Sequence, residues 1–288
     1  MKVITLYLVL LLWGTLARAE DDQLINLPNR PANALSGSAF MKKIARLDGG
    51  ARETAMVAEI LKGNIPSFLR RLTPIDTKLT AGIYRGQTLR YYALPDYLAV
   101  GSDEDYVRVP LNLYSVEKLS EQLDLSLPTV KMVDDIYAHA KQKFAPQPVV
   151  NKLKISSTSN IQTHNDMLKA QFGERYHAGE LTAGHKKDVV QSRRILRKPG
   201  SIAIYGWHRN SESPIQPLST AHSADYADYS HGIRLVSNLV KIGQQTLDLR
   251  DILENKNQAS LLSYEGTIPQ MARMKSQNRT GLAFVTRP

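Results

Sequence analysis

The chain has 288 residues, of which 42% are hydrophobic and 22% are charged. This composition predicts a globular protein with a buried core and excludes a fibrous or intrinsically disordered chain. Lysine and arginine outnumber aspartate and glutamate by 37 to 27, which gives a formal charge of +10, and the chain has no cysteine. Disulfide frameworks and lipid-modified cysteines are therefore excluded. The positive charge favours anionic partners such as cell-wall polymers, acidic glycans or lipid head groups.

We expect no nucleic-acid partner, because the basic residues are scattered along the chain and no zinc-finger or RNA-binding motif is present. The opening residues, MKVITLYLVLLLWGTLARAE, combine a lysine, an apolar run and Ala-Arg-Ala. This pattern predicts a signal peptide over residues 1–19 that is cleaved after Ala19. No apolar run reaches the roughly 20 residues of a membrane-spanning helix. We therefore expect a secreted or periplasmic protein without an integral membrane segment.

The N-terminal half predicts helices and antiparallel strands. Residues 20–38 are rich in Pro, Asn and Ser and predict a tether or a draped segment, and residues 39–148 form a helical and β part. Apolar spacing of three to four residues predicts a helix over 51–64, and alternation around GSDED predicts strands within 88–111. Two further helices are expected over 115–123 and 127–144.

The C-terminal part, residues 149–288, is expected to carry the functional site, either as a separate domain or as one domain with 39–148. The pattern predicts a polar helix over 161–176, a helix or turn over 184–196, a strand over 201–207, a long packed loop over 208–230, and strands over 232–242 and 244–253. The predicted fold class is α+β, with a mixed C-terminal β-sheet, helices and a long functional loop.

Candidate functional residues concentrate between residues 184 and 234. All seven histidines follow residue 138, and four of them fall in this interval: His185, His208, His222 and His231. His208 follows Trp207 at the end of the predicted strand, where a rigid scaffold delivers catalytic groups to a loop. Its alternative role is to hydrogen-bond a neighbouring carbonyl. His139 is expected to be structural, and His164 and His177, which flank a polar helix, carry no further signal.

The stretch HSADYADYSHGIR places a His or Asp at every third position. Two kinds of chemistry remain open. A zinc site would use His208, His222, Asp228 and His231. A metal-free site would use His208 or His231 as general acid or base, Asp225 or Asp228 to orient the imidazole, and Ser230 as nucleophile. The ordinary alternative is that these aspartates cap turns.

Basic and aromatic residues near this stretch predict substrate contacts. Lys186, Lys187 and Arg234 are expected to hold an anionic substrate. Tyr205, Trp207, Tyr226 and Tyr229 are expected to offer faces on which a sugar can stack. The ordinary alternatives are a solvated helix end for the lysines and half-buried packing for the tyrosines.

The blocks GHKKDVV, AIYGWH, PIQPLS and YADYSHGIRLV resemble a family of uncharacterised exported bacterial proteins, which implies that they form one unit. Separately, SHGIRL is similar to the Ser-His-Gly-Cys-Ile-Arg-Leu signature of L,D-transpeptidases, which cross-link peptidoglycan through a cysteine. The upstream His208 also resembles that arrangement. The cysteine is missing here, so the resemblance implies a scaffold related to the cell wall and not the transpeptidase chemistry.

These observations predict an exported hydrolase of a cell-envelope or extracellular polymer, peptidoglycan or glycan, that uses a His/Asp site with or without zinc. The alternative is a non-catalytic module that binds glycan or peptidoglycan through Trp207, Tyr226 and Tyr229. A purely structural envelope protein is the third possibility. Converging His and Asp side chains favour the enzyme, whereas aromatic residues along an open groove favour the binding module.

Overall fold

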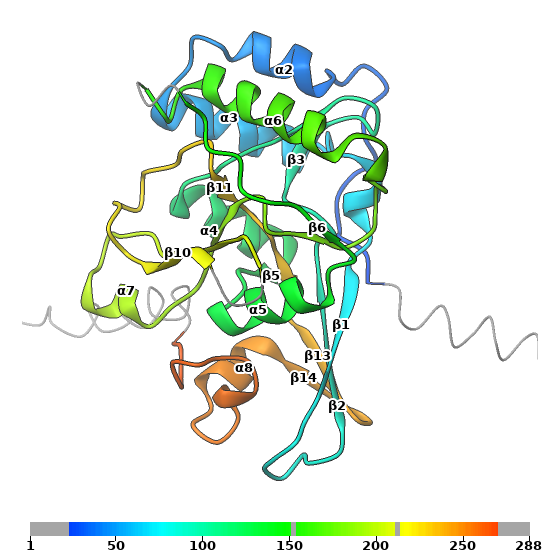
Figure 1. The fold of residues 1–288 in the computed structure, drawn as a ribbon, viewed down its shortest axis with the longest axis vertical. Helices are drawn as coiled ribbons and strands as arrows, with labels where there is room; N and C mark the ends of the chain where they lie inside the picture. Colours follow the sequence, from blue (N-terminus) through cyan, green and yellow to red (C-terminus); the bar gives the residue numbers. More distant parts are fainter. Residues whose placement is uncertain (1–22, 151–153, 211–213, 270–288) are drawn as a thin grey trace, which may run out of the picture.

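The computed structural model describes residues 23–150, 154–210 and 214–269 (Figure 1). The predicted signal peptide therefore lies outside the described residues. The α-helices are α2 (Gly37–Lys43), α3 (Gly49–Leu61), α4 (Leu113–Leu123), α5 (Val130–His139), α6 (Thr158–Phe172), α7 (Arg194–Arg197) and α8 (Leu249–Glu254). Short 3-10 helices are η1 (Ser67–Arg70), η2 (Gly173–Arg175) and η3 (Ala259–Leu261). None of the helices in the described part has the length and apolar character needed to cross a bilayer.

Side-chain caps explain where the central helices begin. The side chains of Asn112, Thr129 and Ser157 accept hydrogen bonds from backbone N–H groups in the first turns of α4, α5 and α6, which are otherwise without partners. Helices were predicted at α3, α4, α5 and α6, and all four are present. The predicted ends extend beyond α5 and α6, because the chain leaves α5 at Ala140 in an extended conformation and turns at Gly173 after α6.

Strands from both halves of the chain form the largest sheet, in the order β14-β13-β2-β12-β5, with β1 also paired to β2. Its strands are β1 (Thr73–Lys78), β2 (Thr88–Ala93), β5 (Leu125–Ser126), β12 (Val236–Ser237), β13 (Leu239–Ile242) and β14 (Gln245–Asp248). All of its pairings are antiparallel. Because β2 pairs with β12 and β13, the two halves share a sheet, which fits the one-domain alternative.

The second sheet has the order β10-β9-β8-β11 and carries the candidate residues. Its strands are β8 (Lys187–Val189), β9 (Ile204–His208), β10 (Pro214–Ser219) and β11 (His231–Gly232). The β8–β11 pair is parallel and the other pairs are antiparallel. Two small pairs complete the strands: β3 (Ala99–Gly101) with β4 (Tyr106–Arg108), and β6 (Gln142–Lys143) with β7 (Thr182–Ala183). The fold is α+β, as predicted.

Three local predictions need correction. Residues 184–196 hold strand β8, since Lys187–Val189 pairs with β9 and lies in the sheet. Residues 208–230 are not only a loop, because β10 pairs along β9. Residues 244–253 change from strand β14 to helix α8 where the Asp248 side chain caps the helix. The segment 23–36 follows the draped alternative, because Ile25 is buried and its N–H bonds to Arg70 O at 2.8 Å.

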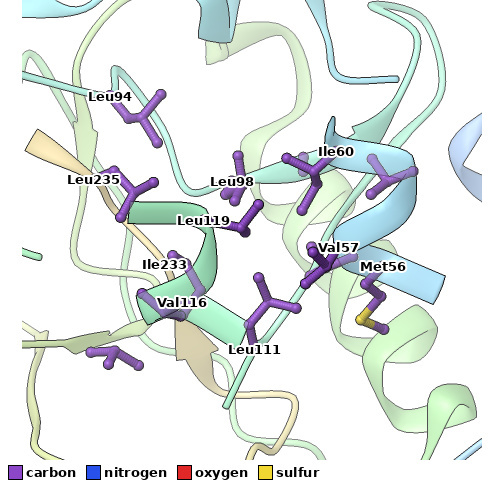
Figure 2. Packing of buried hydrophobic residues seen from close by; sticks show 14 of the residues in the cluster. Met56, Val57, Ile60, Leu94, Leu98, Leu111, Val116, Leu119, Ile233 and Leu235 are labelled. Carbon is purple, nitrogen blue, oxygen red and sulfur yellow. The ribbon is translucent and has the colours of Figure 1, made fainter. Parts of the chain in front are cut away.

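The main core packs helices α3 and α4 against segments from both halves of the chain (Figure 2). Figure 2 shows α3 and α4 contributing Met56, Val57, Ile60, Val116 and Leu119 to the same cluster as Leu94, Leu98, Ile233 and Leu235. Ile233 and Leu235, which flank Arg234, are fully buried. The apolar core therefore fixes the backbone on which the second sheet presents its polar residues.

Candidate functional site

The backbone is strained where β9 delivers His208. Gly206 and Trp207 have φ values of +100° and +56°. A bulky side chain rarely adopts this conformation, which costs about 1–3 kcal/mol and persists only where the surroundings enforce it. A Cβ atom on Gly206 would lie 3.4 Å from the His208 ring and 3.3 Å from Asp188 Oδ2, so the glycine leaves room for both groups. The strained turn thus brings the imidazole and the carboxylate over the same point of the strand.

Helix α5 supplies the partner that orients His208. The Nε2 atom of His208 lies 3.3 Å from Oδ1 of Asp134, and the hydroxyl of Tyr205 donates to the same oxygen at 2.8 Å. The His208 ring also stacks on Tyr137, with centroids 4.6 Å apart. Because a carboxylate only accepts, a neutral His208 places its proton on Nε2 and keeps Nδ1 as its basic atom.

His208, Asp188, Arg234, Tyr97 and Tyr137, among others, surround one point, and they pack so closely that no free space the size of a water molecule remains there. A substrate group could therefore reach His208 and Asp188 only if these side chains moved apart. Burial raises the pKa of Asp188 to about 6, against the effect of the nearby Arg234 and the hydrogen bond from Tyr97. A carboxyl group of this kind can carry a proton near neutral pH.

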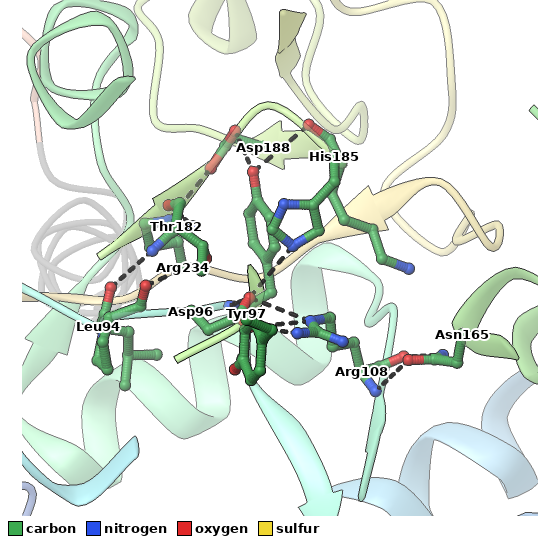
Figure 3. Close-up of polar contacts among 12 residues, drawn as sticks. Leu94, Asp96, Tyr97, Arg108, Asn165, Thr182, His185, Asp188 and Arg234 are labelled. Atoms are coloured by element: carbon green, nitrogen blue, oxygen red, sulfur yellow. Dashed lines mark hydrogen bonds and ion pairs between the residues drawn. The ribbon is translucent and has the colours of Figure 1, made fainter. Parts of the chain in front are cut away.

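Arg234 and Tyr97 both lie against the Asp188 carboxylate (Figure 3). The Tyr97 hydroxyl donates to Asp188 Oδ2 at 2.9 Å, and Arg234 Nε lies 3.9 Å from Oδ1. Arg234 is itself fixed by hydrogen bonds from its guanidinium to the carbonyls of Leu94 and Thr182, at 2.7 and 2.9 Å. The position of the carboxyl group is therefore set by the first sheet and by β7.

A second buried ionic cluster lies next to this site, around Asp96 (Figure 3). Asp96 pairs with Arg108, accepts from the Tyr176 hydroxyl at 3.0 Å, and lies 3.2 Å from His185 Nε2. Burial would raise the pKa of Asp96, but the charge of Arg108 and the bond from His185 dominate and hold it well below its usual value. Burial lowers the pKa of His185 to about 4. Among the described residues, Nη1 of Arg108 and Nδ1 of His185 have no hydrogen-bond partner, so the cluster is held together through Asp96.

His231 lies in a different environment from His208. It is 1% exposed, and neither ring nitrogen has a hydrogen-bond partner among the residues that the structure describes. Burial lowers its pKa to about 4, opposed by Asp228 and reinforced by Lys187. Tyr226 and His222 stack on each other at 4.2 Å, and the His231 ring lies 5.6 Å from Tyr226 and 6.3 Å from His222. His231 is thus a neutral, enclosed imidazole.

The structure contradicts the predicted zinc ligands His208, His222, Asp228 and His231. His208 is on β9 and His231 is on β11, and β8 lies between these strands. Within residues 23–150, 154–210 and 214–269, no group of three or more His, Cys, Asp or Glu side chains is arranged to hold a metal ion. The three-residue spacing failed as a guide because the chain turns between β10 and β11 and does not form one helix or strand.

The predicted orienting and nucleophilic residues also have other partners. Asp225 is exposed and accepts from Ser223, so it orients no histidine. Asp228 accepts from the Tyr226 hydroxyl at 2.9 Å and from the Ser230 hydroxyl at 2.6 Å. Ser230 is 1% exposed, and its hydroxyl donates its hydrogen bond to that carboxylate instead of to a histidine base. These contacts close the turn before β11, which was the ordinary alternative for the aspartates.

The predicted anion-binding cations are used inside the protein. Lys186 is fully buried and donates to the Tyr229 carbonyl at 2.6 Å. Burial and Arg108 lower its pKa to about 7. Arg234 is fully buried as well. Lys187 is half-buried, with its ammonium 4.9 Å from the centroid of the Trp207 ring. Only Lys187 retains access to solvent, so the predicted trio does not form an anion site.

Three of the predicted aromatic faces are also not available as a sugar platform. Trp207 is 7% exposed beneath Lys187, and Tyr229 is 8% exposed with its hydroxyl accepting from Val149 N at 3.0 Å. Tyr226 is half-buried and stacked on His222. Tyr205 alone of the four lies beside His208, with ring centroids 5.6 Å apart.

Sequence reasoning placed His208 at the end of a strand but missed the groups that converge on it, Asp134, Tyr137, Asp188 and Tyr97. Asp134 lies in the same helical stretch as His139, whose ring contacts the carbonyls of Asp135 and Asp76 and is structural as expected. The only sequence signal for Asp188 was its place in the KKDVV block.

A scan against protein-family models and searches of curated proteins and of solved structures found no match to this chain. The geometry of the described residues is therefore the basis for the functional assignment.

Proposed function

We propose that the protein is an exported hydrolase that cuts a glycan or peptidoglycan of the cell envelope, with His208 and Asp188 as its acid–base pair. The observation that carries the proposal is the convergence of these two groups at one strained turn of β9. Catalytic sites concentrate groups with shifted pKa values and local backbone strain, and both features occur here together.

Hydrolysis needs one group that accepts a proton and one that donates a proton, and His208 and Asp188 can take these two roles. Asp134 contacts Nε2 of His208, which leaves Nδ1 to take a proton from water as it attacks the substrate. Asp188, with a pKa of about 6, carries the proton that the leaving group needs. Tyr97 and Arg234 hold the carboxyl group as it loses that proton and becomes charged. Hydrolysis consumes one water molecule: one product gains its hydroxyl group, and the leaving group gains a hydrogen.

An envelope polymer is supported by features outside the site. The predicted signal peptide and the formal charge of +10 favour an exported protein among anionic polymers. The similarity of SHGIRL to the L,D-transpeptidase signature points in the same direction. A binding module receives less support, because Trp207 and Tyr229 are buried and His and Asp side chains converge instead.

The test is release of soluble fragments from purified peptidoglycan and from envelope polysaccharides, separated by chromatography and identified by mass spectrometry. Wild type should release fragments, and Asp188→Asn should release at least about a hundredfold less, because its amide cannot donate an acidic proton. Asp76→Asn is the matched control, since Asp76 forms an exposed pair with Arg90. Absence of fragments from every polymer, or equal rates for both variants, would contradict the proposal.

A further inference from the structure

A basic surface lies on the other side of β10 from β9, where α7 runs beside this edge strand (Figure 1). We define it by Arg193, Arg194, Arg197 and Lys198 on and around α7, together with Leu196 and with Ile215 on β10. All four cations are exposed. The sequence from Val189 to Asn210 contains no aspartate or glutamate. The positive charge is therefore concentrated on this surface and is not balanced within its own segment.

Backbone carbonyls hold three of the four cations, Arg193, Arg194 and Lys198, in place. A guanidinium N–H of Arg194 donates to the Leu218 carbonyl at 2.7 Å, and the Lys198 ammonium donates to the Thr220 carbonyl at 2.8 Å. Arg193 donates to the Glu265 carbonyl at 3.1 Å. Because these acceptors are uncharged carbonyls, the contacts order the side chains without neutralising them.

Two apolar side chains are exposed on the elements that define this surface, Leu196 on α7 and Ile215 on β10. Leu196 is 37% exposed and Ile215 is 40% exposed, whereas their neighbour Ile195 is buried against Val133, Val190 and Ala203. Burying Ile195 fixes α7 so that Leu196 faces solvent. Pro217, also exposed on β10, keeps this edge from pairing with another strand.

We propose that this basic surface binds the face of a membrane that contains anionic phospholipid. The arginine and lysine side chains match the charge of the head groups, and Leu196 and Ile215 can enter the interfacial layer beneath them. A soluble polyanion would use the cations alone and would leave the two apolar side chains in water. This inference is independent of the chemistry proposed at His208.

The experiment is co-sedimentation of the protein, as purified from its producing cell after any processing of its amino terminus, with vesicles. One set is pure phosphatidylcholine and the other contains three parts in ten of phosphatidylglycerol. Binding should require phosphatidylglycerol and weaken in 0.5 M salt. Arg197→Gln should lower the partition coefficient about fivefold, which is the contribution of one basic residue near a charged bilayer.

Two matched controls come from α4. Lys118→Gln removes an exposed cation that lies between Glu117 and Glu121 in the sequence, and Tyr114→Gln removes an apolar side chain that is 56% exposed. Both should leave vesicle binding unchanged, whereas Leu196→Gln should weaken it about threefold through the loss of apolar contact. Circular dichroism confirms that each variant is folded.

Three outcomes would overturn the proposal: equal binding to both vesicle types, equal loss with Lys118→Gln and Arg197→Gln, or unchanged binding of Leu196→Gln together with equally tight binding to soluble polyphosphate. The last result would assign the surface to polyanions instead of lipid.

Discussion

Two histidines on β9 and β11 of the second sheet are both buried, but in different surroundings. His208 and His231 are both almost fully buried, and both were expected to do proton chemistry. His208 has Asp134 beside one ring nitrogen and a strained turn that brings Asp188 close, whereas His231 has no partner on either nitrogen within the described part of the chain and a pKa of about 4. A buried histidine becomes a candidate catalyst when a carboxylate partner orients its ring. Of these two histidines, His208 meets that condition.

The largest expected difference between the two is in activity. His208→Gln should lower the rate of fragment release by about 10²–10⁴-fold, since it removes the proposed base. His231→Gln should change the rate less than threefold in folded protein, because His231 is not among the residues that surround His208 and Asp188. His139→Gln, at a structural histidine, is the control, and rates are measured by chromatography. A larger loss in His231→Gln than in His208→Gln would reverse the assignment.

The second expected difference is in acid stability. Folding lowers the pKa of His231 from about 6.5 to about 4, so the stability present above pH 6.5 is lost as pH falls toward 4. For one such group the loss is roughly 3 kcal/mol. His231→Leu should remove this part, so that its free energy of unfolding falls by about that much less over the same range. Urea titrations from pH 7 to 4 measure it, and an unchanged pH dependence would contradict the burial of a neutral imidazole.

The pH dependence of activity tests the role of Asp188 as the acid. Asp188 should be protonated below its pKa of about 6, so the rate should fall about tenfold per pH unit above that value. Rates of fragment release between pH 5 and 8 measure this, with stability checked at each pH. An alkaline fall in rate that is unchanged in Asp188→Asn would contradict the role of Asp188 as the acid. The Asp188→Asn variant should lose the slope together with most of the activity.

The smallest expected effect concerns orientation. Asp134→Asn should lower the rate about fivefold, because the amide can present either its oxygen or its nitrogen to Nε2 and no longer fixes one tautomer of His208. Asp135→Asn is a matched control on the same helix, since Asp135 pairs with Lys131 at 2.8 Å. The activity optimum should also shift in Asp134→Asn alone. Equal effects of both substitutions would show that the contact with His208 has no role beyond structure.

Local patterns in the sequence identified much of the fold. The apolar spacing of α3, α4 and α5, the Thr129 cap and the GSDED hairpin depend on neighbours within a few residues, and these elements are present. The strand status of Lys187–Val189 was not visible, because a short strand in the middle of a sheet needs partners from β9 and β11 to be recognised. The same limit applies to β10, which was predicted to be part of a long packed loop and needs β9 as its partner to be recognised as a strand.

The sequence by itself determined the α+β composition and the place of His208 at the end of a strand. Tertiary structure alone decided that Asp134 and Asp188 meet His208, while Arg234 and Lys186 are enclosed. The physical reason is that charge and residue type are local properties, whereas burial and partnership depend on chain segments brought together from distant positions. A histidine or an arginine in the sequence therefore names a chemical capacity, and only packing determines whether that capacity faces a substrate or the core.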